Sequence, residues 1–129
     1  MRNLYYDLNF STLTTLNIVN QTYFTIEHGS DTILNLLNSP TIYSIYITET
    51  PIYQIIGLNV CSKLRVFSIV DSNLTSDDLT NILDTLVYMN PPSLYHVRLN
   101  HVNGSVPSSE SIDSFITKYP DCYFVYILD

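Results

Sequence analysis

Residues 75–99 read TSDDLTNILDTLVYMNPPSLYHVRL and contain the two signals that predict the fold. The first part repeats apolar residues at the spacing of one helical face, at Leu79, Ile82, Leu83, Leu86 and Val87. Residues 75–78 precede this face with capping hydroxyls and two carboxylates, which favour a helix N-terminus. After two prolines, apolar residues recur at Leu94, Val97 and Leu99 with the spacing of a short strand. The stretch therefore predicts a helix followed by a strand.

The strand pattern recurs four more times along the chain. Its apolar positions 1, 4 and 6 are Leu13, Leu16 and Ile18; Ile42, Ile45 and Ile47; Leu64, Phe67 and Ile69; Leu94, Val97 and Leu99; and Cys122, Val125 and Ile127. The spacings between copies are 29, 22, 30 and 28 residues. Pro40, Pro92 and Pro120 each stand two residues before position 1, where proline ends a preceding helix and sets an extended backbone. We therefore predict one domain, residues 1–129, with repeats that start near 13, 42, 64, 94 and 122.

The residues between the strands differ from repeat to repeat. A second helix is predicted after Ser109 and Glu110, with its apolar face at Ile112, Phe115, Ile116 and Tyr119. A shorter helix is predicted after Asp31, with Ile33, Leu34, Leu36 and Leu37. The repeat from Ile42 to Lys63 is too short for a full helix and contains Pro51 and Gly57, so we expect a 3₁₀ turn or an extended segment there. Residues 1–12, with Tyr6, Phe10 and Leu13 at helical spacing, are predicted to form a lid over the first strand.

This pattern resembles the leucine-rich-repeat family, and the long repeats resemble its ribonuclease-inhibitor-like subclass, in which an LxxLxL strand is followed by a helix. The resemblance covers roughly residues 13–127. It implies an α/β solenoid with a curved parallel sheet of about five strands and with helices on the convex side. It also implies a binding module, because in that family the strands line a concave face that binds other proteins.

Alternation along each strand sorts the candidate binding residues. Positions 1, 4 and 6 are predicted to face inward, positions 3 and 5 outward, and position 2 to flank them. The candidates for partner binding are Tyr43, Tyr46, Arg65, Tyr95, His96, Arg98, Tyr123 and Tyr126, and Phe124 also falls at an outward position. Tyrosine and arginine are enriched at binding hot spots. The alternative is that aromatic residues are simply favoured in strands.

The composition limits the classes of partner. The chain is 46% hydrophobic and 13% charged with a net charge of -7, so we expect a folded protein that repels nucleic acid and anionic lipid. A basic or neutral protein is the expected partner. No apolar stretch reaches the roughly 20 residues of a spanning helix, and no secretory signal is recognisable. Together with Cys61 and Cys122, interpreted as small buried hydrophobic residues rather than a disulfide, this predicts a cytoplasmic protein.

Catalytic and metal sites are not predicted. His28, His96 and His101 are the obvious general bases, and no cysteine or carboxylate pair stands near them at zinc-ligand spacing. Gly29, Gly57 and Gly104 are isolated, so the glycine-rich phosphate and dinucleotide motifs are missing. We therefore expect a non-enzyme that binds no cofactor and no metal.

Three hypotheses for function stay open. The leading one is protein recognition through the concave sheet face. The second is self-assembly, because the last predicted strand, Cys122–Asp129, would offer an open edge for a homodimer. The third is a small α/β domain of unknown activity, with an open parallel sheet and helices on both faces.

Overall fold

The computed structural model describes residues 4–7, 15–19, 32–37, 40–49, 52, 54–70, 74–89, 93–99 and 105–126. Its elements, in chain order, are β1 (Leu4–Asp7), β2 (Thr15–Val19), β3 (Thr32–Asn35), β4 (Ser44–Thr48), β5 (Gln54–Ile56), η1 (Leu58–Val60), β6 (Val66–Val70), α2 (Ser76–Met89), β7 (His96–Arg98), α3 (Ser109–Lys118) and β8 (Tyr123–Val125). The chain is therefore an α/β protein.

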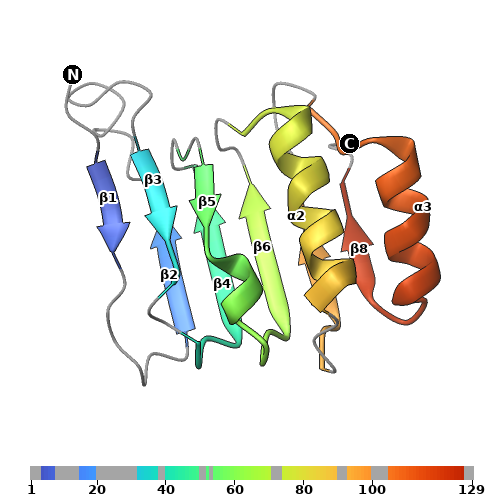
Figure 1. Ribbon diagram of the computed structural model, residues 1–129, viewed down its shortest axis with the longest axis horizontal. Helices are drawn as coiled ribbons and strands as arrows, with labels where there is room; N and C mark the ends of the chain where they lie inside the picture. The colour runs from blue at the N-terminus through green and yellow to red at the C-terminus, as the bar shows by residue number, and fades with distance from the viewer. Residues whose placement is uncertain are drawn as a thin grey trace.

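The strands form two parallel sheets whose order follows the chain. The larger sheet has the order β2-β4-β6-β7-β8, and the smaller has the order β1-β3-β5. In Figure 1 the smaller sheet and both helices lie on the same side of the larger sheet. The five predicted parallel strands are confirmed, and an arrangement with described helices on both faces of the larger sheet is not observed.

The core lies between the larger sheet and this second layer. The inward residues of the strands are fully buried, namely Ile45, Ile47, Phe67, Ile69 and Val97. They belong to one cluster with Leu79, Leu83 and Leu86 of α2 and Phe115 of α3. Because each buried aliphatic or aromatic side chain contributes roughly 1.5–3 kcal/mol, the apolar positions of the repeat supply the main stabilisation of both layers.

Helix α2 begins where the sequence predicts. The backbone N–H of Asp78 donates to Oγ1 of Thr75 over 3.2 Å, and the N–H of Thr75 donates to Oδ2 of Asp78 over 2.9 Å. This reciprocal pair satisfies two backbone donors at the helix start. The predicted apolar face is confirmed, because Leu79, Ile82, Leu83 and Leu86 are buried and Val87 packs against the core.

Helix α3 is also confirmed, although its buried face is rotated from the predicted one. The hydroxyl of Ser108 caps the helix by accepting from the N–H of Ser111. Ile112 and Phe115 are buried as predicted, but Ile116 is 48% exposed. Ser111 is buried instead, and its hydroxyl donates to Oδ1 of Asp84 on α2 over 2.6 Å. The helix turns Ser111 inward because it packs against α2 as well as against the sheet.

The helix predicted after Asp31 is wrong, because Thr32–Asn35 forms strand β3 between β1 and β5. Leu34 and Leu36 are fully buried and Leu37 is exposed. Burial at every second residue is the pattern of a strand. So short an apolar run gains too few hydrogen bonds to nucleate a helix, whereas neighbouring strands satisfy its backbone. The 22-residue repeat contains β5 followed by η1, so the expectation of an extended or 3₁₀ segment is confirmed.

The N-terminal segment predicted as a lid contributes strand β1 at Leu4–Asp7, which pairs with β3 rather than forming a helical turn. Phe10 and Leu13 lie outside the described residues. Whether residues 1–12 cover the first strand therefore stays a prediction.

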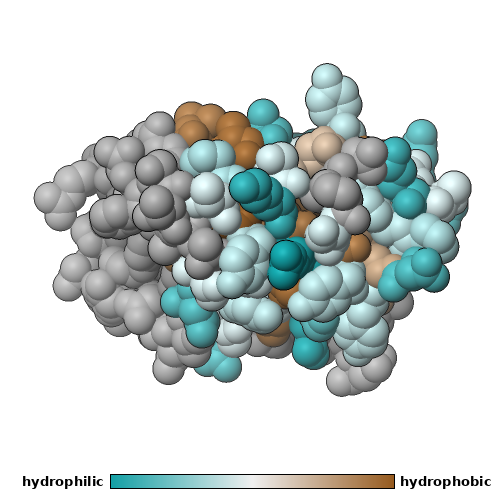
Figure 2. Space-filling model, turned by 90° about the horizontal axis from the view of Figure 1, so that it is seen from below, coloured by the Kyte–Doolittle hydropathy of each residue, from teal (hydrophilic) through white to brown (hydrophobic). Residues whose placement is uncertain are grey.

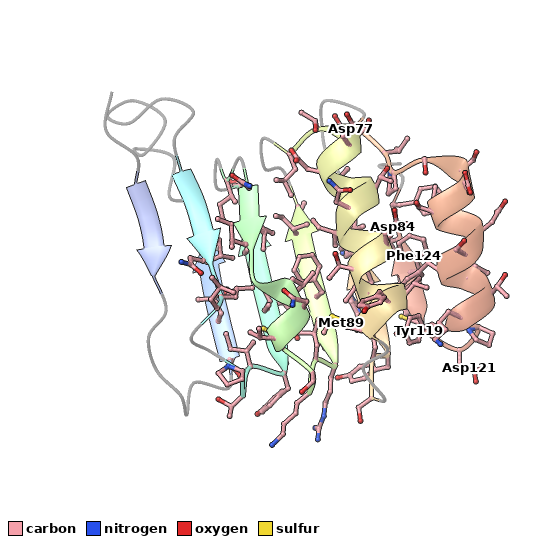
Figure 3. All side chains as sticks on the ribbon, in the orientation of Figure 1. Asp77, Asp84, Met89, Tyr119, Asp121 and Phe124 are labelled. Carbon is pink, nitrogen blue, oxygen red and sulfur yellow. The ribbon has the colours of Figure 1, made fainter. Side chains whose placement is uncertain are left out.

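The last strand differs from its predicted register by one residue. Tyr123 is the partner of His96 and Phe124 is the partner of Val97, so Phe124 occupies the inward position assigned to Val125. Cys122, Phe124 and Tyr126 pack against the core, and the Phe124 ring lies 4.8 Å from the Phe115 ring. Figure 3 shows Phe124 between α2 and α3. A shift of one residue exchanges the two faces of a strand, which is why the outward prediction for Phe124 and Tyr126 is wrong.

Candidate functional site

The candidate site is the side of the larger sheet that faces away from both helices, here called the outer sheet face. Strand register arranges its side chains in two rows. One row contains Thr15, Ser44, Val66, His96 and Tyr123, and the other contains Asn17, Tyr46, Ser68, Arg98 and Val125. Parallel pairing holds each row in line across the sheet, so the chain positions these side chains on a rigid scaffold.

An arginine lies against a tyrosine at the margin where the strands begin. The guanidinium carbon of Arg65 is 5.1 Å from the centroid of the Tyr43 ring. The backbone holds the pair in register, because the N–H of Arg65 donates to the carbonyl of Tyr43 over 2.8 Å. The N–H of Tyr95 donates in turn to the carbonyl of Arg65, and the N–H of Tyr123 donates to the carbonyl of Tyr95. Tyr43, Arg65 and Tyr95 therefore follow one another along this margin, and Tyr123 lies one residue further along its strand, beside His96.

His96 and Tyr123 form a ring pair in the first row of the outer sheet face, on the last two strands, β7 and β8. The rings of His96 and Tyr123 have centroids 5.1 Å apart and an interplanar angle of 44°. Burial lowers the pKa of His96 below its ordinary value of 6.5, and the positive charge of Arg98 lowers it further. His96 is therefore neutral at neutral pH, when its ring acts mainly as an apolar partner for Tyr123.

The centre of the face is built from small side chains with larger ones on either side. Ser44, Val66 and Ser68 are buried although they face outward. Their neighbours across the sheet, Tyr46 and Arg98, are exposed. Because these three small side chains have little exposed surface, a partner segment on this face would contact mainly the tyrosine and arginine side chains around them.

The structure brings the predicted binding residues together with one exception. Tyr43, Tyr46, Arg65, Tyr95, His96, Arg98 and Tyr123 lie on the outer sheet face or along its margin. Tyr126 does not, because it packs with Phe124 against the core, 5.0 Å between ring centroids. Val125 takes the outward position beside Arg98, and sequence reasoning missed it because the register of the last strand was wrong.

Charge is distributed unevenly between the two sides of the molecule. Arg65 and Arg98 are exposed on the outer sheet face and its margin, and Glu49 is exposed directly after β4. Helices α2 and α3 contain five acidic residues and one basic residue, Lys118. Figure 2, which looks at the end where β4 and β6 begin, shows mainly hydrophilic and intermediate side chains over its coloured part, with the largest hydrophobic group at the upper edge. Arg65 and Arg98 therefore give the outer sheet face exposed positive groups although the net charge of the whole chain is -7.

The remaining reactive groups are poor nucleophiles or isolated. Cys61 is buried, and burial raises the pKa of its thiol to about 11. Burial also raises the pKa of the Cys122 thiol to about 11, against a smaller opposing effect of a backbone hydrogen bond with Val97. Since the thiolate is the reactive form, both groups are inert at neutral pH. Over the described ranges, no three histidine, cysteine or acidic side chains gather closely enough to hold a metal ion.

Comparisons with known proteins add no assignment to this geometry. Protein-family models, curated proteins and solved structures give no match to the chain. No helix among the residues that the structure describes is long and apolar enough to cross a membrane. The fold defines the class of protein as α/β with a five-stranded parallel sheet.

Proposed function

We propose that this protein is a non-catalytic recognition module that binds another protein through the outer sheet face. The observation that carries the proposal is the Arg65–Tyr43 pair, with its 5.1 Å separation, beside the exposed side chains of Tyr95, Arg98 and Tyr123. Tyr95 is 57% exposed and Tyr123 is 60% exposed. Large aromatic and guanidinium groups exposed on a sheet have the composition of a binding hot spot.

The chemistry of the face favours a partner with acidic or neutral contact residues. Arginine binds carboxylates through two parallel hydrogen bonds, and tyrosine adds a broad apolar ring with a polar hydroxyl. The strands hold these side chains in place before binding, which reduces the entropy lost on association. The expectation of a basic partner rested on the net charge of the whole chain, whereas the local charge of Arg65 and Arg98 supports the opposite preference.

We further propose that the fold is a short solenoid related to the leucine-rich repeats. Two features support it: strand order follows chain order in both sheets, and each repeat adds one strand to the larger sheet. The layer behind that sheet changes from strands β1, β3 and β5 to helices α2 and α3 along the chain. A solenoid is consistent with this change, because each repeat needs only its neighbours to bury its apolar face.

The test compares two doubly substituted proteins in affinity capture from the native host. Arg98→Glu with Tyr46→Ala changes the outer sheet face, and Lys118→Glu with Ile116→Ala makes matched changes, one charge reversal and one large side chain removed, on α3 of the helix side. The first variant is expected to lose the captured partner and keep its melting temperature, while the second retains the partner. Capture that survives the first variant, or disappears only with the second, would contradict the outer sheet face as the site.

A second candidate function is assembly with another copy of the chain. Strand β8 is the last strand in the order of the larger sheet, and Tyr123 on it is 60% exposed. A strand at a sheet edge presents unpaired backbone groups that can pair with a second copy about a two-fold axis. Light scattering of the purified protein over a range of concentrations tests this. A monomer at the highest concentration would eliminate the candidate.

A further inference from the structure

The layer of helices and small strands contains a groove beside α2. Two hollows of about 120 and 490 Å³ share the side chains of Ile55 and Leu58 on one side and of Asn81 and Thr85 on the other. Since the hollows share both walls, they form one continuous groove, here called the α2 groove. The larger hollow falls within the roughly 300–1,000 Å³ typical of ligand sites.

The groove follows from the length of one repeat. The copies starting at Ile42 and Leu64 are only 22 residues apart, and strand β5 with the three-residue η1 takes the place in the layer that α2 and α3 take in the next two repeats. The next element, α2, is a helix of 14 residues. A strand and one 3₁₀ turn extend less far from the larger sheet than a helix does. One side of α2 is therefore left partly uncovered.

The lining combines an apolar floor with polar walls. Leu58 and Ile82 are buried at the base, while Gln54, Asn59 and Asn81 are exposed along the walls. Thr85 uses its hydroxyl hydrogen to donate to the carbonyl of Asn81 over 2.7 Å, so its oxygen remains an acceptor. Such a surface accepts apolar side chains below and hydrogen bonds from a peptide backbone above.

The acidic residues of the groove indicate the charge of the segment that binds there. Asp78 lines the smaller hollow and Asp84 lines the larger one, and α2 contains no lysine or arginine. The segments β5 and η1 on the opposite wall, QII and LNV, carry no charge. Figure 3 shows Asp77 at one end of α2 and Asp84 near its middle, so carboxylates are spread along the helix. The groove therefore attracts positive charge.

Asp78 and Asp84 each have a second carboxylate oxygen that can accept a hydrogen bond from a lysine or arginine side chain. Oδ2 of Asp78 accepts from Thr75, and Oδ1 of Asp84 accepts from Ser111. Asp84 is six positions after Asp78 in the helix, which is about 9 Å along the axis. In an extended segment, side chains on one face repeat about every 6.6 Å, and flexible lysine side chains reach over the remaining distance. Tyr88, 87% exposed beside the larger hollow, offers a ring to a cation.

We propose that the α2 groove binds a basic segment of a partner protein, an extended peptide in which lysine or arginine alternates with apolar residues. The apolar side chains lie on Ile55, Leu58 and Ile82, and the cations lie near Asp78, Asp84 and Tyr88. This site is separate from the outer sheet face and does not depend on the function proposed for that face.

The test measures binding of fluorescent short peptides to the full chain by anisotropy. One peptide alternates lysine with leucine, a second alternates glutamate with leucine, and a third alternates lysine with serine. Thr85→Arg places a large side chain in the groove and adds a positive charge that offsets part of the charge of Asp78 and Asp84. Thr117→Arg makes the same substitution at an exposed position on α3, away from the groove. Melting temperatures confirm that both variants are folded.

The lysine and leucine peptide is expected to bind the parent and the Thr117→Arg protein equally, and at least about tenfold more weakly to Thr85→Arg, a loss of roughly 1.4 kcal/mol. The glutamate peptide is expected not to bind. Equal binding to both variants, equal binding of the lysine and serine peptide, or no binding of the lysine and leucine peptide would each overturn the proposal. If Thr85→Arg is unfolded, Tyr88→Ala with Asp84→Asn replaces it, and unchanged binding by that variant also overturns the proposal.

Discussion

The guanidinium carbon of Arg65 lies 5.1 Å from the centroid of the Tyr43 ring, across two adjacent strands of the larger sheet. The pair joins the side chains of two repeats at the margin of the outer sheet face. A cation over an aromatic ring at an exposed site contributes roughly 0.5–1 kcal/mol. Its contribution to the folded state is therefore small, and its importance in the proposed function comes from the orientation it gives to Arg65.

A double-mutant cycle tests this pair. Arg65→Met and Tyr43→Leu are expected to show a coupling of about 0.5–1 kcal/mol in the free energy of unfolding measured with urea. Arg65→Met combined with Tyr88→Ala serves as the control, because Tyr88 belongs to α2 and the two changes are expected to add. A coupling no larger than that of the control pair would show that the ring does not stabilise the guanidinium.

Gly57 is predicted to be intolerant of any side chain. Its φ is +83°, and a Cβ atom there would lie 2.7 Å from the backbone nitrogen of Leu37. Gly57→Ala is expected to lower the free energy of unfolding by about 1–3 kcal/mol, because a left-handed residue is strained and the close approach of β5 to the end of β3 is lost. Urea unfolding measures the change, with exposed Asn59→Ala as the control. Equal stability of the two variants would contradict the close packing at Gly57.

The hydrogen bond at the N-terminal cap of α2 is predicted to contribute measurably to the stability of the protein. Thr75→Ala removes the hydroxyl that accepts from Asp78 and is expected to cost about 0.5–2 kcal/mol. Thr75→Ser keeps the hydroxyl and is expected to retain most of this stability. Ser76→Ala, at the next exposed position, provides the control. If thermal unfolding shows alanine and serine at position 75 to be equivalent, the hydrogen bond is not the source of the stability.

Stability is predicted to depend on pH through His96. Burial first, and the charge of Arg98 second, lower the pKa of His96 in the folded state below the value of 6.5. The unfolded chain therefore binds a proton more readily, so the contribution of His96 is intact above pH 6.5 and is lost as pH falls through its folded pKa. His96→Gln is expected to lose less in melting temperature between pH 7.5 and pH 5 than the parent does, roughly in proportion to that pKa difference.

The other titrating groups are common to both proteins, so the difference between the two pH profiles isolates His96. Glutamine serves as the comparison because it cannot acquire the positive charge that histidine gains in acid. Parallel profiles for the parent and for His96→Gln would show that burial of the ring does not affect its protonation.

The two helices were predictable because their signals are local. A hydroxyl and acidic residues precede a face of apolar residues at helical spacing, and both α2 and α3 begin at or within one residue of the positions that these signals indicate. The inward residues of strands β4, β6 and β7 were predictable for the same reason, since alternation within a few residues decides their burial. The outward positions of Tyr46 and Arg98 followed directly, and Arg65 was predicted at a flanking position.

The sequence by itself determined the five parallel strands, the two helices and most of the outer sheet face, because these depend on residues that are neighbours along the chain. Only the tertiary structure decided the register of β8, where Phe124 rather than Val125 faces inward, because the Phe124 ring packs on Phe115 of α3 and on Tyr126. It also decided that residues 32–35 pair as a strand, because the partners β1 and β5 are distant in sequence. The α2 groove depends in the same way on how a short repeat packs beside a long helix.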